Sequence, residues 1–208
     1  EALETPHPRW SRWPSASEAL ETARRVSRLG RGRPRTSTNV GDDDAVTTPT
    51  DTRITLSRVM SQAEANLLGN VHGGNIMKMV DDTAGVSANR FAQGPAVTAA
   101  MDEMAFLNPV RVGDVLHVSA QVNWAGTSSM EVGVRAEVDR WDAVTDRVHV
   151  ASAYLVFVAV DVEGGTRQVP GLSIETPEEQ RRFREAEIRR AYRKLARELH
   201  PDVNPGQE

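Results

Sequence analysis

The chain has 208 residues and a formal net charge of −4, with 39% hydrophobic and 5% aromatic residues. This length suits one or two domains with a substantial core, and the acidic balance argues against general affinity for nucleic acid. The absence of cysteine excludes disulfides, thiolate catalysis and sulfur-ligated metals. No apolar run approaches the ~20 residues that span a membrane, so we expect a cytoplasmic protein without membrane contact.

Residues 1–50 are rich in Arg, Ser, Pro and Thr and show no sustained apolar period, although 17–29 has short helical spacing. A basic run of six arginines between residues 24 and 35 precedes three aspartates at 42–44. Mixed charge with little hydrophobicity is typical of a solvated, disordered extension, which is our prediction. An arm for nucleic acid or for an anionic membrane is the alternative.

Residues 51–173 have the pattern of a globular domain. Hydrophobic periodicity predicts a strand over 53–60, a loop to 72 and a helix over 74–92, followed by strands over 115–124, 130–139 and 148–162. The last strand is continuously apolar and is expected at the centre of the sheet. The other two long strands alternate, which predicts one buried and one solvent-facing side. The fold class is therefore α+β, with an antiparallel sheet able to curl around one long helix.

Residues 69–85 are the most informative stretch, because a Gly-rich turn opens directly into an apolar helix. Gly73 and Gly74 leave backbone N–H groups accessible, and a helix start adds unsatisfied donors and a positive dipole end. The Gly74 N–H is thus our candidate donor to a developing oxyanion. Asp81 follows about 10 Å further along the axis, too far to act on the same carbonyl within one chain. We therefore expect an active site shared between two chains.

The Asn-Val-His-Gly-Gly turn at 70–74 with Asp81 behind it resembles the acyl-CoA thioesterases of the hotdog superfamily, in particular the cytosolic acyl-CoA hydrolase branch. The resemblance runs from about Arg53 to about Leu172. It implies a hotdog fold, in which an antiparallel sheet wraps around a central helix. It also implies hydrolysis of fatty acyl-CoA to free fatty acid and coenzyme A without a cofactor, by a homodimer or a higher homo-oligomer such as a hexamer.

The resemblance also assigns roles to residues. Asp81 would activate water or attack the thioester itself, and Asn70 would orient that water or bond the carbonyl oxygen. Asp82 is expected to be an ordinary exposed helical residue. Substrate contacts are expected from His72 and Gly73, and from a loop that resembles the family's hairpin near the coenzyme A nucleotide: Gly126, Thr127, Ser128 and Ser129.

Three further readings remain open. A non-catalytic acyl-CoA-binding regulator would share the fold without turnover. A hotdog dehydratase would be expected to pair a histidine with an acid, and only His72 is placed to do so. His117 and His149 lie on separate predicted strands without ligand-like spacing, so no metal site is expected.

The third reading concerns residues 174–208, which form a charged helix and tail. Thr176-Pro177-Glu178-Glu179 is a typical helix start, with proline at the first helical position. Residues 187–206 resemble the second helix and His-Pro-Asp loop of a J domain, which engages an Hsp70 partner, and a chaperone-linked interaction protein is therefore an alternative. The first and third J-domain helices are missing, so we expect no working J domain and no partners for four apolar residues: Ile188, Tyr192, Leu195 and Leu199.

Overall fold

The computed structural model describes residues 47–102 and 104–199. The predicted extension over 1–50 and the tail after 199 therefore lie almost wholly outside the described residues. The elements in chain order are the 3-10 helix η2 (Thr50–Thr52), β1 (Ile54–Val59), the 3-10 helix η3 (Gln62–Glu64), α2 (Gly73–Ala92), β2 (Ala96–Met101), β3 (Ala105–Phe106), β4 (Val115–Ala125), β5 (Ser129–Asp139), β6 (Val148–Ala159) and α3 (Pro177–Leu199).

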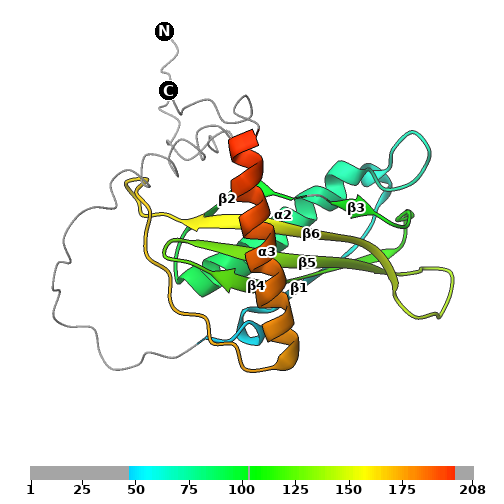
Figure 1. Ribbon diagram of the computed structural model, residues 1–208. Helices are drawn as coiled ribbons and strands as arrows, with labels where there is room; N and C mark the ends of the chain where they lie inside the picture. The colour runs from blue at the N-terminus through cyan, green and yellow to red at the C-terminus, as the bar shows by residue number, and fades with distance from the viewer. Residues whose placement is uncertain (1–46, 103, 200–208) are drawn as a thin grey trace, which may run out of the picture.

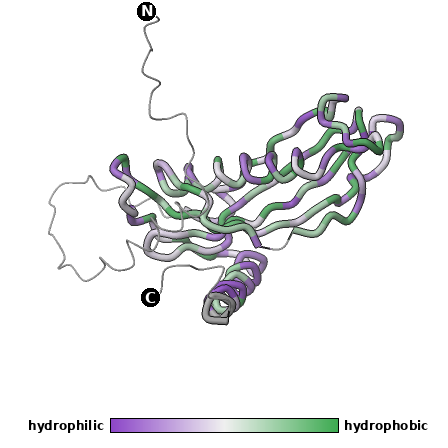
Figure 2. The backbone as a smooth tube through the Cα atoms, turned by 90° about the horizontal axis from the view of Figure 1, so that it is seen from above, coloured by the Kyte–Doolittle hydropathy of each residue, from purple (hydrophilic) through white to green (hydrophobic). Residues whose placement is uncertain are grey.

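The strands form one antiparallel sheet in the order β1-β4-β5-β6-β2, with β3 also paired to β6. Helix α2 lies on one face of this sheet and α3 crosses the opposite face (Figure 1). Seen from above, the molecule has three layers, with the sheet between the two helices (Figure 2). The predicted α+β arrangement around one long helix is confirmed. No helix in the described part of the chain is long and apolar enough to cross a membrane.

Helix α2 forms because its apolar residues recur at the helical period. Ile76, Val80, Ala84 and Ala88 are all buried, which confirms these four residues of the predicted inner face. Met77, which was also predicted on that face, is 40% exposed, so the prediction is wrong for this residue. The helix ends at Gln93, which adopts a left-handed conformation with φ of 54°. Residues in this conformation commonly end helices, because the chain then turns away and the last carbonyls find new donors.

Two strands were not predicted. β2 reads Ala-Val-Thr-Ala-Ala-Met, which is short, alanine-rich and not alternating, and β3 has only two residues. The remaining predicted elements begin or end within three residues of the observed ones. β2 stands at the end of the strand order, so its outer edge faces no strand among the residues that the structure describes. An unpaired edge presents free backbone donors and acceptors.

The prediction that one side of β4 and β5 faces solvent is wrong for the central part of these strands. Gln121, Asn123 and Glu131 belong to this side, yet Glu131 is fully buried and the other two are at most 4% exposed. Helix α3 covers them. Arg189 and Arg193 each donate to the Glu131 carboxylate, at 2.7 and 2.8 Å. A buried carboxylate is tolerated here because two guanidinium groups compensate its charge.

Further polar contacts hold α3 on the sheet. Arg193 also bonds Asp102 at 2.5 Å, and the Arg189 guanidinium lies 3.5 Å over the Tyr154 ring. At the helix start the Glu179 carboxylate accepts the Thr176 N–H, while the Thr176 hydroxyl accepts the Glu179 N–H. This reciprocal pair is a capping box and accounts for the predicted start at Pro177.

Candidate active site

His72 is the N-cap residue of α2. Its side chain caps the helix, because Nδ1 accepts the Gly74 N–H at 3.0 Å. A neutral ring in this arrangement carries its proton on Nε2. The Gly74 N–H, our candidate oxyanion donor, is thus occupied in this structure. Its predicted role requires the His72 ring to turn away when substrate binds.

The two glycines leave room for neighbouring side chains. A Cβ on Gly73 would lie 3.3 Å from the Phe106 ring, and one on Gly74 would lie 3.1 Å from the His72 ring. Both distances are tighter than ordinary contacts. The Gly-Gly pair thus allows an aromatic ring from β3 to lie directly against the backbone at the start of α2.

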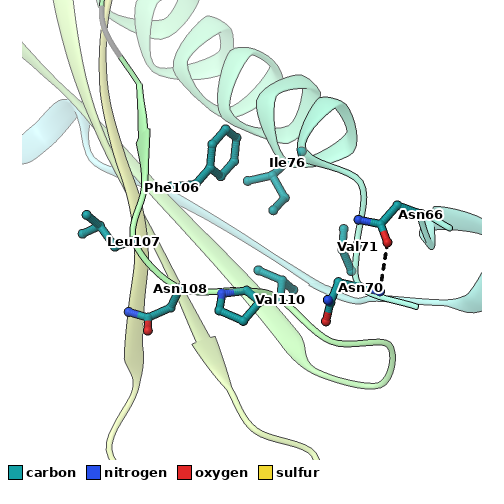
Figure 3. A pocket seen from close by; sticks show the side chains of 10 residues that line it. Asn66, Asn70, Val71, Ile76, Phe106, Leu107, Asn108 and Val110 are labelled. Carbon is teal, nitrogen blue, oxygen red and sulfur yellow. Dashed lines mark hydrogen bonds between the residues drawn. The ribbon is translucent and has the colours of Figure 1, made fainter. Parts of the chain in front are cut away.

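Asn66 was not singled out from the sequence, and it organises this turn. Its Oδ1 accepts the N–H of Leu68 at 2.8 Å and that of Asn70 at 3.2 Å. These bonds fix the orientation of the amide. Its Nδ2 then points away from the turn, toward Ile76 and Val71, and no residue in the described part of the chain accepts a hydrogen bond from it (Figure 3). The sequence did indicate a turn at Asn66, because an asparagine shortly before a glycine is typical of turns. In the structure Gly69 has a positive φ, which few residues other than glycine adopt.

A cavity of about 300 Å³ lies beside this turn (Figure 3). Asn70 and Gly73, both predicted site residues, line it together with Asn66. The rest of its wall is largely apolar and comes from the start of α2 and from the segment after β3: Val71, Ile76, Phe106, Leu107, Asn108, Pro109 and Val110. An amide-rich mouth over apolar walls suits a ligand with a polar head and a hydrocarbon part.

Asp81 lies elsewhere on α2 and is not among the residues that line this cavity. It is half-buried, and its Oδ1 accepts the Thr98 hydroxyl at 2.7 Å. Thr98 was missed because β2 itself was missed. Asp82 is exposed and pairs with Lys78 at 2.6 Å, as expected of an ordinary surface residue. Asp81 thus sits where α2 meets the free edge strand of the sheet.

The predicted nucleotide loop joins β4 to β5, away from the cavity lining. Within it Gly126 donates to the Ser129 carbonyl, and the carbonyls of Thr127 and Ser128 accept from Val169 and Ala159. A Cβ on Gly126 would lie 2.6 Å from the Trp124 ring, so a larger residue here would require that ring to shift. The contact of this loop with a nucleotide stays a prediction. In the described part of the chain, no three His, Asp or Glu side chains form a group able to hold a metal ion.

An antiparallel sheet that carries one long buried helix on its inner face is the hotdog arrangement, with the Gly-Gly turn and the acidic residue on that helix. The thioesterase superfamily model matches residues 68–140. The cytosolic acyl coenzyme A thioester hydrolase of Homo sapiens is 33% identical over 72% of this chain and 40% of its own length. The uncharacterized acyl-CoA thioester hydrolase YkhA of Bacillus subtilis is 37% identical over 56% of this chain and 67% of its own length. The chain belongs to the thioesterase superfamily.

Solved structures of acyl-CoA hydrolases and thioesterases have the same fold as this chain. An acyl-CoA hydrolase of Staphylococcus aureus, in complex with butyryl coenzyme A, has 32% identity and a TM-score of 0.68, covering 76% of this chain and 93% of the other. Structures of variants of that enzyme replace an asparagine, an aspartate or a threonine by alanine. A hexameric acyl-CoA thioesterase has 30% identity and a TM-score of 0.69, covering 73% of this chain and 96% of its own. A second family model, the DnaJ domain, matches residues 178–208. The chain spans 40% of the length of the human relative.

Proposed function

We propose that this protein hydrolyses acyl-CoA thioesters to a free acid and coenzyme A. The observation that carries the proposal is the combination of a fixed amide at the cavity mouth with a carboxylate held by Thr98 at the sheet edge. The names of relatives with the same fold support the choice of acyl-CoA. No cofactor is needed, because a thioester is already activated. The names of the human and rodent relatives support a cytosolic location.

The variants of the Staphylococcus aureus enzyme support particular residues. Their aspartate lies 15 positions after the asparagine, and their threonine lies 17 positions after the aspartate. The same spacing separates Asn66, Asp81 and Thr98 in this chain. We therefore assign the carbonyl-binding amide to Asn66, with Asn70 as the competing candidate. Comparing Asn66→Ala with Asn70→Ala decides between them.

In the proposed reaction Asp81 takes a proton from water as the water oxygen bonds to the thioester carbonyl carbon. The Asn66 Nδ2 donates to the carbonyl oxygen as negative charge develops on it. The carbon–sulfur bond then breaks, and the proton passes to the sulfur to give coenzyme A. Thr98 holds the carboxylate in place. Attack by Asp81 itself is the alternative; it would release coenzyme A and leave an acyl–Asp81 anhydride, which water then hydrolyses. A single turnover in heavy-oxygen water detects this route when water attacks the Asp81 carbonyl, because the label then enters Asp81 and the first acid released is unlabelled.

The site is proposed to need two chains. Asp81 does not line the cavity that holds Asn66, while β2, which carries Thr98, has a free edge onto which a second copy can add a strand. Such an arrangement would bring the cavity of one chain to the Asp81 of its partner. The hexameric relatives support a homo-oligomer, such as a hexamer built from these pairs.

The deciding experiment measures release of the coenzyme A thiol from short- to long-chain acyl-CoAs. We expect Asp81→Ala to lose turnover by about 10²- to 10⁴-fold, the usual contribution of a general base, while still binding acyl-CoA. Asp82→Ala is the matched control and should keep full activity. Binding by the wild type without any turnover would favour the non-catalytic regulator, and retained turnover in Asp81→Ala would refute the role of this residue.

A mixing experiment tests the shared site. Asn66→Ala and Asp81→Ala are each expected to be inactive alone, but a mixed dimer would contain one site with both wild-type residues. Co-expression in equal amounts should restore about a quarter of wild-type activity, because half the dimers are mixed and half of their sites are intact. A site built within one chain would show no restoration.

The carboxy-terminal segment gives a second prediction. Although the DnaJ model matches 178–208, two basic residues of α3, Arg189 and Arg193, are bound to the sheet. Ile188 and Tyr192 are exposed, as expected for apolar residues without packing partners. We propose that this segment does not work as a J domain. Stimulation of Hsp70 ATPase by the full chain, abolished by His200→Gln, would overturn this; we expect no stimulation by either.

A further inference from the structure

The cavity beside Asn66 has a chemical character that the reaction alone does not explain. None of the ten residues that line it is charged. Its polar side chains are the amides of Asn66 and Asn70 at the turn and of Asn108 after β3, whose Nδ2 donates to the His149 carbonyl. The rest of its wall is formed by apolar side chains such as Ile76 and Val110, which are 3% and 1% exposed. Phosphates would be expected to meet cationic side chains. The lining therefore disfavours the nucleotide part of coenzyme A and favours a hydrocarbon.

Phe106 is the half-exposed part of this wall. Ile76 and Val110 belong to the buried core, but Phe106 is 48% exposed and stands on a two-residue strand that pairs only with β6. Its ring lies against the Gly73 backbone and beside Ile76 (Figure 3). A half-exposed side chain at the end of a short strand can change rotamer with little cost to the core.

We propose that this cavity receives the acyl chain of the substrate and that Phe106 limits its length. This inference rests on the proposed function, because the thioester carbonyl must lie at Asn66 for the hydrocarbon to extend toward Phe106. The volume, about 300 Å³, is at the small end of the range for ligand pockets. The preferred substrates are therefore short- to medium-chain acyl-CoAs.

The test uses chain length in both directions. Each methylene that enters an apolar pocket should raise kcat/KM about fourfold until the cavity is full. In Phe106→Ala the optimum should move to longer chains by at least two carbons, and in Phe106→Trp to shorter chains. A variant that merely folds poorly loses activity at every length and cannot give opposite shifts. Trp141→Ala is the control. It removes an exposed aromatic ring that does not line the cavity, and it should leave the chain-length profile unchanged.

Binding is measured in parallel, with non-hydrolysable thioether analogues of the same chain lengths and with free coenzyme A. The analogue affinities should show the same shifts, while the affinity for free coenzyme A should stay within twofold in all variants. Chain-dependent binding without turnover would support the acyl cavity and contradict the hydrolysis. An unchanged chain-length profile in both Phe106 variants, or a changed affinity for free coenzyme A alone, would overturn the inference and place the pantetheine arm in this cavity.

Discussion

Helices α2 and α3 lie on opposite faces of the same sheet, and different interactions hold them there (Figure 2). α2 packs through aliphatic side chains such as Val80 and Ala84, which are at most 1% exposed. α3 is held by ion pairs, chiefly those of Arg189 and Arg193 with the buried Glu131. Ala186 is the one buried hydrophobic residue in the part of α3 whose side chains are described, whereas the larger Ile188 and Tyr192 are exposed.

This difference shows where an amphipathic pattern is informative. In α2 the apolar stripe marks the contact with the sheet, because burial of hydrocarbon drives the contact. In α3 the charged side makes the contact, since the sheet offers it a carboxylate and an aromatic ring. A helix that contacts its neighbour through arginines cannot be oriented from hydrophobic periodicity. Three stability measurements test this contrast.

The largest effect is expected from the inner helix. Phe91→Ala removes an aromatic ring that is 2% exposed at the end of α2, and it should lower the free energy of unfolding by about 4 kcal/mol. Tyr192→Ala on α3 is the matched change, because that ring is 72% exposed, and it should cost at most about 0.5 kcal/mol. Chemical denaturation of both variants measures the difference. Equal losses would mean that α3 also packs through its apolar side.

The next effect concerns the buried ion pairs. Glu131→Ala leaves Arg189 and Arg193 without their main partner, and it should cost about 3 kcal/mol. Glu137→Ala on the same strand is the control, because Glu137 pairs with Arg135 near the surface and such pairs contribute about 1 kcal/mol or less. A double-mutant cycle between Glu131 and Arg189 should give a coupling energy of at least about 1 kcal/mol. Additive losses would contradict the role of this pair in docking α3.

The smallest effect is expected from the start of α3 and depends on pH. Burial raises the pKa of Glu179, but hydrogen bonds from the Thr176 and Glu175 N–H groups and from the Thr50 hydroxyl outweigh it and lower the pKa from 4.5 to about 2. A carboxylate whose pKa is lowered by folding stabilises the fold above the unfolded value, and this contribution is lost as pH falls through the folded value. Stability should therefore decline between about pH 5 and about pH 2, as this carboxylate is protonated.

Glu179→Gln should remove that part of the pH dependence. Glu178→Gln is the control, because hydrogen bonds from Arg181 and Arg182 lower the Glu178 pKa to about 2 as well, yet Glu178 is exposed and solvent screens its pairs. Unfolding curves at several pH values between 2 and 7 measure both. A flattening as large in Glu178→Gln as in Glu179→Gln would show that the cap does not anchor α3.

The site could be predicted in part. The Gly-Gly turn and Asp81 are visible in one short stretch of sequence, because a turn that feeds a helix is a local feature. Asn66 was missed, although its Asx turn is also local, because it lies outside the more recognisable Asn-Val-His-Gly-Gly motif, which contains Asn70. Thr98 was missed for another reason. It lies on an alanine-rich strand without alternation, and only its pairing with β6 makes that segment a strand.

The sequence by itself determined the inner helix, the long strands and their antiparallel class, since these follow from apolar periods within a few residues of the chain. Only the tertiary structure decided which polar side chains meet. Thr98 reaches Asp81 across 17 positions, Arg189 reaches Glu131 across 58, and Phe106 closes a cavity against Gly73. Such contacts depend on strand order and on the face that each helix turns to the sheet. Hydrophobic periodicity does not predict them, because it describes only residues that are close together in the sequence.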